Sequence, residues 1–111
     1  MASGKYKLDN LCVIVDKNNL QIDGTTDEVM SSAPLDDKFK SFGFEVITID
    51  GNNILEIMKA FAKARTVKNK PTCIIAETIK GKGISFMEDR VEWHGKAPNE
   101  EQYNLAMQEL N

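Results

Sequence analysis

Three apolar runs stand out along the chain, and each has the length and composition of a β-strand. They are Leu11–Val15, Glu45–Asp50 and Pro71–Ile79. The first is nearly continuous, which is typical of a strand buried on both faces of a parallel sheet, and the other two are rich in β-branched residues. The pattern predicts three strands of one parallel sheet.

Helical periodicity fills the segments between and after these runs. A short helix is predicted from about Pro34 to Phe42, with Gly43 at its C-terminal cap, and a longer one from about Asn53 to Val67. A last helix follows Asn99. The apolar positions predicted to share a helix face are Ile54, Ile57, Met58 and Phe61 in the long helix, and Tyr103, Ala106, Met107 and Leu110 in the last one. Alternation of strands and helices predicts an α/β fold of three layers, with a mostly parallel sheet between flanking helices.

The predicted sheet is narrow for its class. Sheets usually have five or six strands, and fully apolar strands need helices on both faces, whereas this chain has one long crossover helix. Met1–Asn10 resembles the remainder of a helix, with Tyr6 and Leu8 as apolar remnants. We therefore expect part of a domain, with a sheet edge open to further strands. A homo-oligomer is a secondary expectation.

Charge and composition narrow the classes of function. The chain has 111 residues, with 14 Lys and Arg against 17 Asp and Glu, so neither nucleic acid nor a membrane is expected as its main partner. No signal peptide is apparent, so a cytoplasmic location is expected. Cys12 and Cys73 lie in apolar runs and are predicted to be two buried thiols without a disulfide. One histidine and two cysteines cannot form a four-ligand zinc site within this chain.

Three polar loops could carry chemistry, and each has a plain structural alternative. Asp16–Gly24 offers amide and carbonyl oxygens to a hard cation such as Mg²⁺, or is a polar turn. Ile79–Ile84 has glycines whose exposed amides, with two lysines, suit a phosphate, or is a surface turn. Glu92–Pro98 holds the only Trp and the only His. His94 is a candidate proton donor to a phosphate or hydroxyl, or a structural histidine.

Taken together, five segments resemble the second half of the thiamine-diphosphate-binding domain of transketolases. The resemblance is densest to the N-terminal subunit of two-chain bacterial and archaeal enzymes, and it covers the chain from Lys5 onward. It implies that residues 1–111 form a partial thiamine-diphosphate-binding (transketolase N-terminal) domain, with thiamine diphosphate and Mg²⁺ or Ca²⁺ as cofactors. The five segments are Asp16–Gly24, Lys38–Phe44, Lys70–Thr72, Thr78–Gly83 and Trp93–Pro98.

The resemblance also implies roles at the cofactor. The Asn18 side-chain oxygen and the Leu20 backbone carbonyl would bind the metal ion, and Ile22 would press on the cofactor rings. Lys80 would lie near the diphosphate. His94 would reach both the diphosphate and the hydroxyls of the sugar substrate, which makes it the catalytic candidate.

Substrates and partners follow from the same resemblance. Transketolases transfer a two-carbon glycolaldehyde unit between sugar phosphates, and Lys96 would lie at the entrance where these substrates approach. This sequence lacks the metal-binding aspartate that the family has in a Gly-Asp-Gly segment. It also lacks the glutamate that activates the aminopyrimidine ring of the cofactor. We therefore expect the isolated chain to be inactive, and to need a complementary C-terminal subunit or a missing N-terminal half. The alternatives are a non-catalytic binding or assembly module, or another thiamine-diphosphate enzyme.

Overall fold

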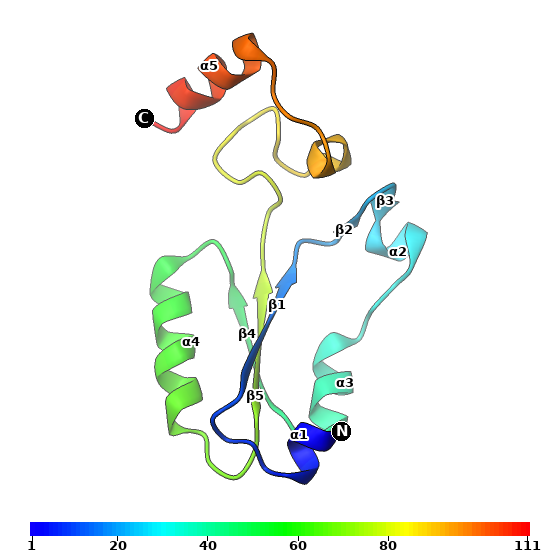
Figure 1. Cartoon of the computed structure of the whole chain (residues 1–111), viewed down its shortest axis with the longest axis vertical. Helices are drawn as coiled ribbons and strands as arrows, with labels where there is room; N and C mark the ends of the chain where they lie inside the picture. The colour runs from blue at the N-terminus through cyan, green and yellow to red at the C-terminus, as the bar shows by residue number, and fades with distance from the viewer. The chain divides into compact units, whose positions relative to one another are not determined.

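The computed structural model describes residues 1–111, which form two compact units (Figure 1). The first unit consists of Met1–Lys17 and Ser32–Thr78. The second consists of Asn18–Ser31 and Ile79–Asn111. The segments of each unit are therefore distant in the sequence but adjacent in space.

The first unit is built on a three-stranded parallel sheet with the strand order β1-β5-β4. The strands are β1 (Cys12–Lys17), β4 (Glu45–Asp50) and β5 (Thr72–Glu77). The central strand β5 is almost completely buried because it has a neighbour on each side. The predicted parallel sheet is confirmed, with strand ends close to those expected from the sequence.

Helices α3 (Leu35–Ser41) and α4 (Ile54–Thr66) flank this sheet. α3 lies on the connection from β1 to β4, and α4 on the return from β4 to β5. Because the two connections cross the sheet in opposite directions, right-handed crossovers place their helices on opposite faces, as Figure 1 shows. The predicted arrangement of three layers is confirmed. The unit also contains a short helix, α1 (Ala2–Lys5), within the segment expected to be a helix remnant.

Residues at the helix ends explain where α4 begins and α3 stops. The Asn53 side-chain oxygen accepts hydrogen bonds from the amides of Leu55 and Glu56 at the start of α4. Glu56 does not complete a capping box, because its carboxylate accepts from the Asp50 amide instead. Gly43 follows α3 with φ +85°, the left-handed conformation that ends many helices.

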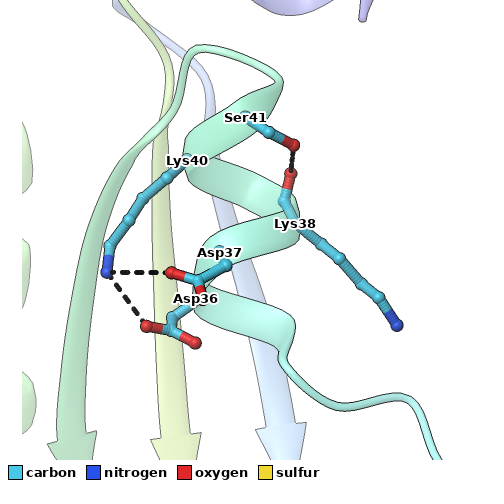
Figure 2. A network of polar contacts seen from close by, with 5 residues as sticks. All are labelled: Asp36, Asp37, Lys38, Lys40 and Ser41. Atoms are coloured by element: carbon cyan, nitrogen blue, oxygen red, sulfur yellow. Dashed lines mark hydrogen bonds and ion pairs between the residues drawn. The ribbon is translucent and has the colours of Figure 1, made fainter.

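Polar contacts along α3 are local to the helix and its entry (Figure 2). The Lys40 ammonium lies 2.9 Å from the Asp36 carboxylate and 3.7 Å from that of Asp37, and the Ser41 hydroxyl donates to the Lys38 carbonyl. The Lys38 side chain points away from this group and donates to two backbone carbonyls before the helix. Ion pairs between such fully exposed groups contribute little to stability. They orient α3 and its entry more than they stabilise the fold.

Strand β1 differs from the sequence prediction, because it is not buried on both faces. Its residues alternate between exposed and half-buried, with Ile14 55% exposed. The reason is its place at the sheet edge, since both crossover helices contact β4 at the opposite edge. The prediction of two buried thiols is accordingly right for Cys73 and wrong for Cys12, which is exposed. Both thiols are free, as expected.

The apolar stripe predicted for α4 is only partly buried. The helix meets the sheet through its small residues Ala60 and Ala64, which allow close approach, while Ile54 and Met58 are exposed. The sequence predicted that these residues share a helix face, and in the structure that face is only partly covered.

The second unit is made of short elements joined by loops. β2 (Leu20–Gln21) and β3 (Gly24–Thr25) form an antiparallel hairpin, followed by α2 (Thr26–Val29). The other segment contains a 3-10 helix, η1 (Val91–His94), and α5 (Glu100–Glu109).

Helix α5 is confirmed with its predicted cap, since the Asn99 side chain and the Gln102 amide are bonded at 2.8 Å. This predicted shared face is buried only at Ala106, and its other members Tyr103, Met107 and Leu110 are exposed. None of the chain's helices combines the length and apolar character that crossing a bilayer demands.

Candidate functional site

The segments that carry the predicted site residues belong to the same compact unit. Asn18, Leu20 and Ile22 lie in one segment of the second unit, and Lys80, His94 and Lys96 lie in the other. The loops that the sequence singles out are therefore gathered in one part of the molecule. The roles of the individual side chains stay predictions.

The turn after β1 fixes the two predicted metal ligands. The Asn18 side-chain oxygen accepts a hydrogen bond from the Leu20 amide at 3.0 Å, and the Asn19 carbonyl accepts from the Thr26 amide at 2.9 Å. These bonds hold the Asn18 carboxamide beside the backbone of Leu20, and both residues are half-buried. An amide oxygen keeps a second lone pair when it accepts one bond, so Asn18 retains acceptor capacity.

Ile22, at the tip of the β2–β3 hairpin, is 63% exposed and has φ +33°. A β-branched side chain at positive φ is a genuine outlier that costs on the order of 1–3 kcal/mol. An apolar side chain held outward on a strained turn suits contact with a flat apolar ligand. The cofactor-ring contact that the resemblance implies for Ile22 stays a prediction.

The turn Ile79–Ile84, which contains Lys80 and Lys82 and is called the lysine turn below, has a backbone fixed by its glycines. Gly81 and Gly83 have φ +73° and +97°, and a Cβ added to Gly81 would lie 2.6 Å from the Met87 carbonyl oxygen. The amides of Lys82 and Ile84 are bonded to carbonyls of the turn itself. Glycine is thus required at Gly81 both for its conformation and for space.

Glu88 organises this turn, and sequence reasoning missed it. Its carboxylate accepts from the Gly83 amide at 3.0 Å and lies 3.3 Å from the Lys82 ammonium. The Gly83 amide, and then Lys82, hold the pKa of Glu88 below its usual value. The prediction that the turn offers its amides to a phosphate is therefore wrong for Gly83, Lys82 and Ile84. The Lys80 ammonium makes no ion pair and is the cation of this turn that is available to a ligand.

A second carboxylate ties the turn to α5. Glu109 accepts from both the amide and the hydroxyl of Ser85, the latter at 2.7 Å. The hydroxyl, and then the amide, lower the pKa of Glu109. Two glutamates thus fix the loop after Lys80, and no sequence motif marked either of them.

His94 lies at the end of η1, within the loop Glu92–Pro98 that also contains Trp93. The Trp93 indole donates to the Phe86 carbonyl at 3.1 Å, and the two rings meet edge to face at 5.5 Å. The Lys96 ammonium lies 5.0 Å from the centre of the Trp93 ring. Trp93 therefore anchors the loop, while the imidazole of His94 is exposed to solvent.

The residues present fit part of a metal–diphosphate site. Asn18 and Leu20 offer neutral oxygens, which Mg²⁺ and Ca²⁺ accept, and Lys80 offers a positive charge to a phosphate. The structure contains no group of three or more His, Cys, Asp or Glu side chains that could hold a metal ion. A complete divalent site therefore needs carboxylate and phosphate oxygens from outside this set.

Comparison with known proteins decides the family. The sequence model of the transketolase thiamine diphosphate binding domain matches residues 1–111. This chain belongs to the transketolase family. A transketolase from Campylobacter jejuni superposes with a TM-score of 0.89 at 34% identity, over 96% of this chain and 17% of that one. The fold is therefore that of the transketolase domain, as the resemblance implied.

Curated transketolase relatives support the same family assignment. One of the subunits of the apulose-4-phosphate transketolase of Phocaeicola vulgatus is 42% identical over 111 residues, which are 100% of this chain and 40% of that protein. Human transketolase is 39% identical over 108 residues, or 95% of this chain and 16% of that one. The chain thus spans about two fifths of the shorter relative and about a sixth of the longer one.

Proposed function

We propose that this chain supplies one part of the cofactor site of a transketolase that transfers a two-carbon unit between sugar phosphates. The observation that carries the proposal is the gathering of the Asn18, Lys80 and His94 segments in one compact unit of a family member. Sugar phosphates as substrates fit the name of the Phocaeicola vulgatus relative.

The chain's own residues have separate tasks in this proposal. Asn18 and Leu20 hold Mg²⁺ or Ca²⁺ through neutral oxygens, and Lys80 balances the charge of the diphosphate. Ile22 orients the cofactor rings. Thiamine diphosphate supplies the two-carbon transfer chemistry when it is bound.

Two further residues act on the substrate side. The exposed imidazole of His94 donates or accepts a proton at a sugar hydroxyl and contacts the diphosphate. Lys96, held over the Trp93 ring, attracts the phosphate of an approaching sugar. Trp93 fixes the position of both residues through its bond to Phe86.

The proposed site is shared with other polypeptide. Because the donor set lacks carboxylates, we propose that it is completed by the sequence that the Phocaeicola vulgatus relative has beyond the matched region, together with a complementary second subunit. The isolated chain is then inactive. The cytoplasmic location and the homo-oligomer expected from the sequence stay predictions.

A chimera tests this function directly. The aligned segment of the Phocaeicola vulgatus relative is replaced by this chain, and two-carbon transfer is measured with the complementary subunit, thiamine diphosphate and Mg²⁺. We expect activity in the chimera, loss of at least tenfold in Asn18→Ala and His94→Ala, and no change in Tyr103→Ala, a matched exposed control on α5. A chimera that folds and binds its partner subunit but transfers nothing would contradict the proposal.

A non-catalytic binding or assembly module is the second candidate, and the missing carboxylate ligands favour it for the chain by itself. Calorimetry separates the two. Thiamine diphosphate that binds the chimera supports the enzyme, whereas a folded chimera that binds none supports the module.

A further inference from the structure

The lysine turn is closed by the two residues Glu88 and Asp89. The Glu88 Oε1 atom accepts from the Gly83 amide at 3.0 Å and lies 3.3 Å from the Lys82 ammonium. The amide of the next residue, Asp89, donates to the Lys80 carbonyl at 3.0 Å. Two consecutive residues therefore hold the turn at both ends, Glu88 through its side chain and Asp89 through its backbone.

The backbone at Asp89 has the conformation that this closure needs. Asp89 has φ +55°, in the left-handed region, where aspartate and asparagine are enriched among residues other than glycine. The preceding amide, that of Glu88, donates to the Ile84 carbonyl at 3.1 Å. The chain thus doubles back onto the turn and then reverses at Asp89, whose side chain is exposed.

The two lysines of the turn have different surroundings. Lys82 is paired with Glu88, whereas the half-buried Lys80 makes no ion pair. A lysine side chain loses rotamer freedom when it binds a phosphate. Fixing the backbone of Lys80 beforehand reduces the further freedom that is lost on binding. The contacts of Glu88 and Asp89 supply this fixed backbone.

We propose that Glu88 and Asp89 are positioning residues for Lys80. They hold its backbone so that the ammonium is directed at a diphosphate, which they do not themselves contact. The proposal rests on the proposed function for the identity of the ligand. In a loosened turn the Lys80 ammonium is correctly placed in fewer molecules, and the apparent affinity falls by the same fraction.

Charge alone predicts the opposite effect. Glu88→Ala removes a negative charge and frees the Lys82 ammonium, so long-range electrostatics would tighten the binding of a diphosphate. Loss of positioning would weaken it. The sign of the change in affinity therefore distinguishes the two explanations.

Calorimetry on the chimera measures this sign, with the complementary subunit, thiamine diphosphate and Mg²⁺ present. Glu88→Ala should raise the Kd of thiamine diphosphate about fivefold or more, while kcat at saturating cofactor stays within about twofold. Glu88→Gln keeps an acceptor oxygen of the same reach and should recover most of the affinity. Glu101→Ala, which removes the same charge from an exposed position on α5, should leave the Kd unchanged.

A double variant shows whether Glu88 acts through Lys80. Lys80→Met should weaken cofactor binding by itself. In the Lys80→Met background, Glu88→Ala should cause no further loss, because the group that it positions has been removed. A contribution of Glu88 to stability alone would instead lower the affinity by the same factor in both backgrounds.

Hydrogen exchange tests the closure in the whole chain without any cofactor. Glu88→Ala should speed the exchange of the Gly83 amide about tenfold. Asp89→Val, which places a β-branched residue at positive φ, should do the same for the amide at position 89, and Asp89→Asn should do so much less. Circular dichroism checks that each variant is folded.

Several results would overturn the assignment. These are unchanged or tighter cofactor binding in Glu88→Ala, an equal further loss in the Lys80→Met background, or amide exchange that Glu88→Ala does not alter. A chimera that binds thiamine diphosphate with the expected dependence on Glu88 but transfers nothing supports the positioning and contradicts the proposed function. An active chimera whose cofactor affinity is insensitive to Glu88 contradicts the positioning alone, and a folded chimera that binds no cofactor contradicts both.

Discussion

The row of aligned isoleucines across the sheet allows a matched test of where the core lies. Ile14 and Ile74 are register partners on adjacent strands, yet Ile74 is 2% exposed and Ile14 is 55% exposed. Replacing either by alanine removes the same three carbon atoms. The difference in unfolding free energy therefore reports burial alone.

The expected magnitudes follow from the exposure. Three methylene-sized groups at about 0.8 kcal/mol each give about 2.4 kcal/mol for Ile74→Ala, and the residual cavity raises this to about 3–5 kcal/mol. Ile14→Ala loses less than half of the transfer contribution and leaves no enclosed cavity, so about 1 kcal/mol is expected. A domain of this size is stable by only about 5–15 kcal/mol, so the first change is severe.

Urea unfolding followed by far-ultraviolet circular dichroism measures both variants, because α4 packs on the same sheet. With a slope of about 2 kcal/mol per molar urea, the midpoint should fall by roughly 2 M in Ile74→Ala and by roughly 0.5 M in Ile14→Ala. If Ile74→Ala does not fold, Ile74→Val should cost about 0.5–1.5 kcal/mol. Equal midpoint shifts in the two alanine variants would refute the reasoning.

Three further measurements address other parts of the chain. Gly81→Ala should loosen the lysine turn, because φ +73° costs about 1–2 kcal/mol for alanine and the new Cβ would collide with a carbonyl. Hydrogen exchange of the amides in this turn should then become faster. The control Gly95→Ala, where a Cβ has open space, should leave exchange unchanged. At pH 8 a disulfide reagent should titrate the exposed Cys12 quickly and Cys73 only on unfolding, because burial and then the nearby thiol raise the pKa of Cys73 to about 11. Equal rates would contradict this. Glu109→Gln should lower stability above about pH 4.5 and become neutral as pH falls further, since the lowered pKa of Glu109 stabilises the fold only while the group is charged. A constant difference across the pH range would count against it.

Hydrophobic patterning predicted the elements of the fold but not their burial. A continuous apolar run identifies Leu11–Val15 as a strand, yet the same pattern arises whether or not other polypeptide covers it. Burial of Cys12, Ile54 and Met58 depends on neighbours that local sequence does not encode. The strand order β1-β5-β4 was not predicted, because crossover handedness sets the face on which a helix lies and not which strands become neighbours.

At the candidate site, the sequence identified the loops and missed the groups that fix them. Glu88 and Glu109 act through their conformations and through partners up to 24 residues away, which no motif shows. Helix α2, after the hairpin, could have been predicted from the sequence, because Thr25 and Glu28 have the spacing of a capping box. The structure contains this capping box. The two-residue strands β2 and β3 are too short for a period-two pattern.

The anchoring of Trp93 has a practical consequence. As the single tryptophan of the chain, it bonds to Phe86, supports Lys96 and immediately precedes His94. Its emission arises entirely from the loop on which substrate is proposed to arrive. Occupancy of that loop can thus be followed optically in the unlabelled protein, without any engineered fluorophore.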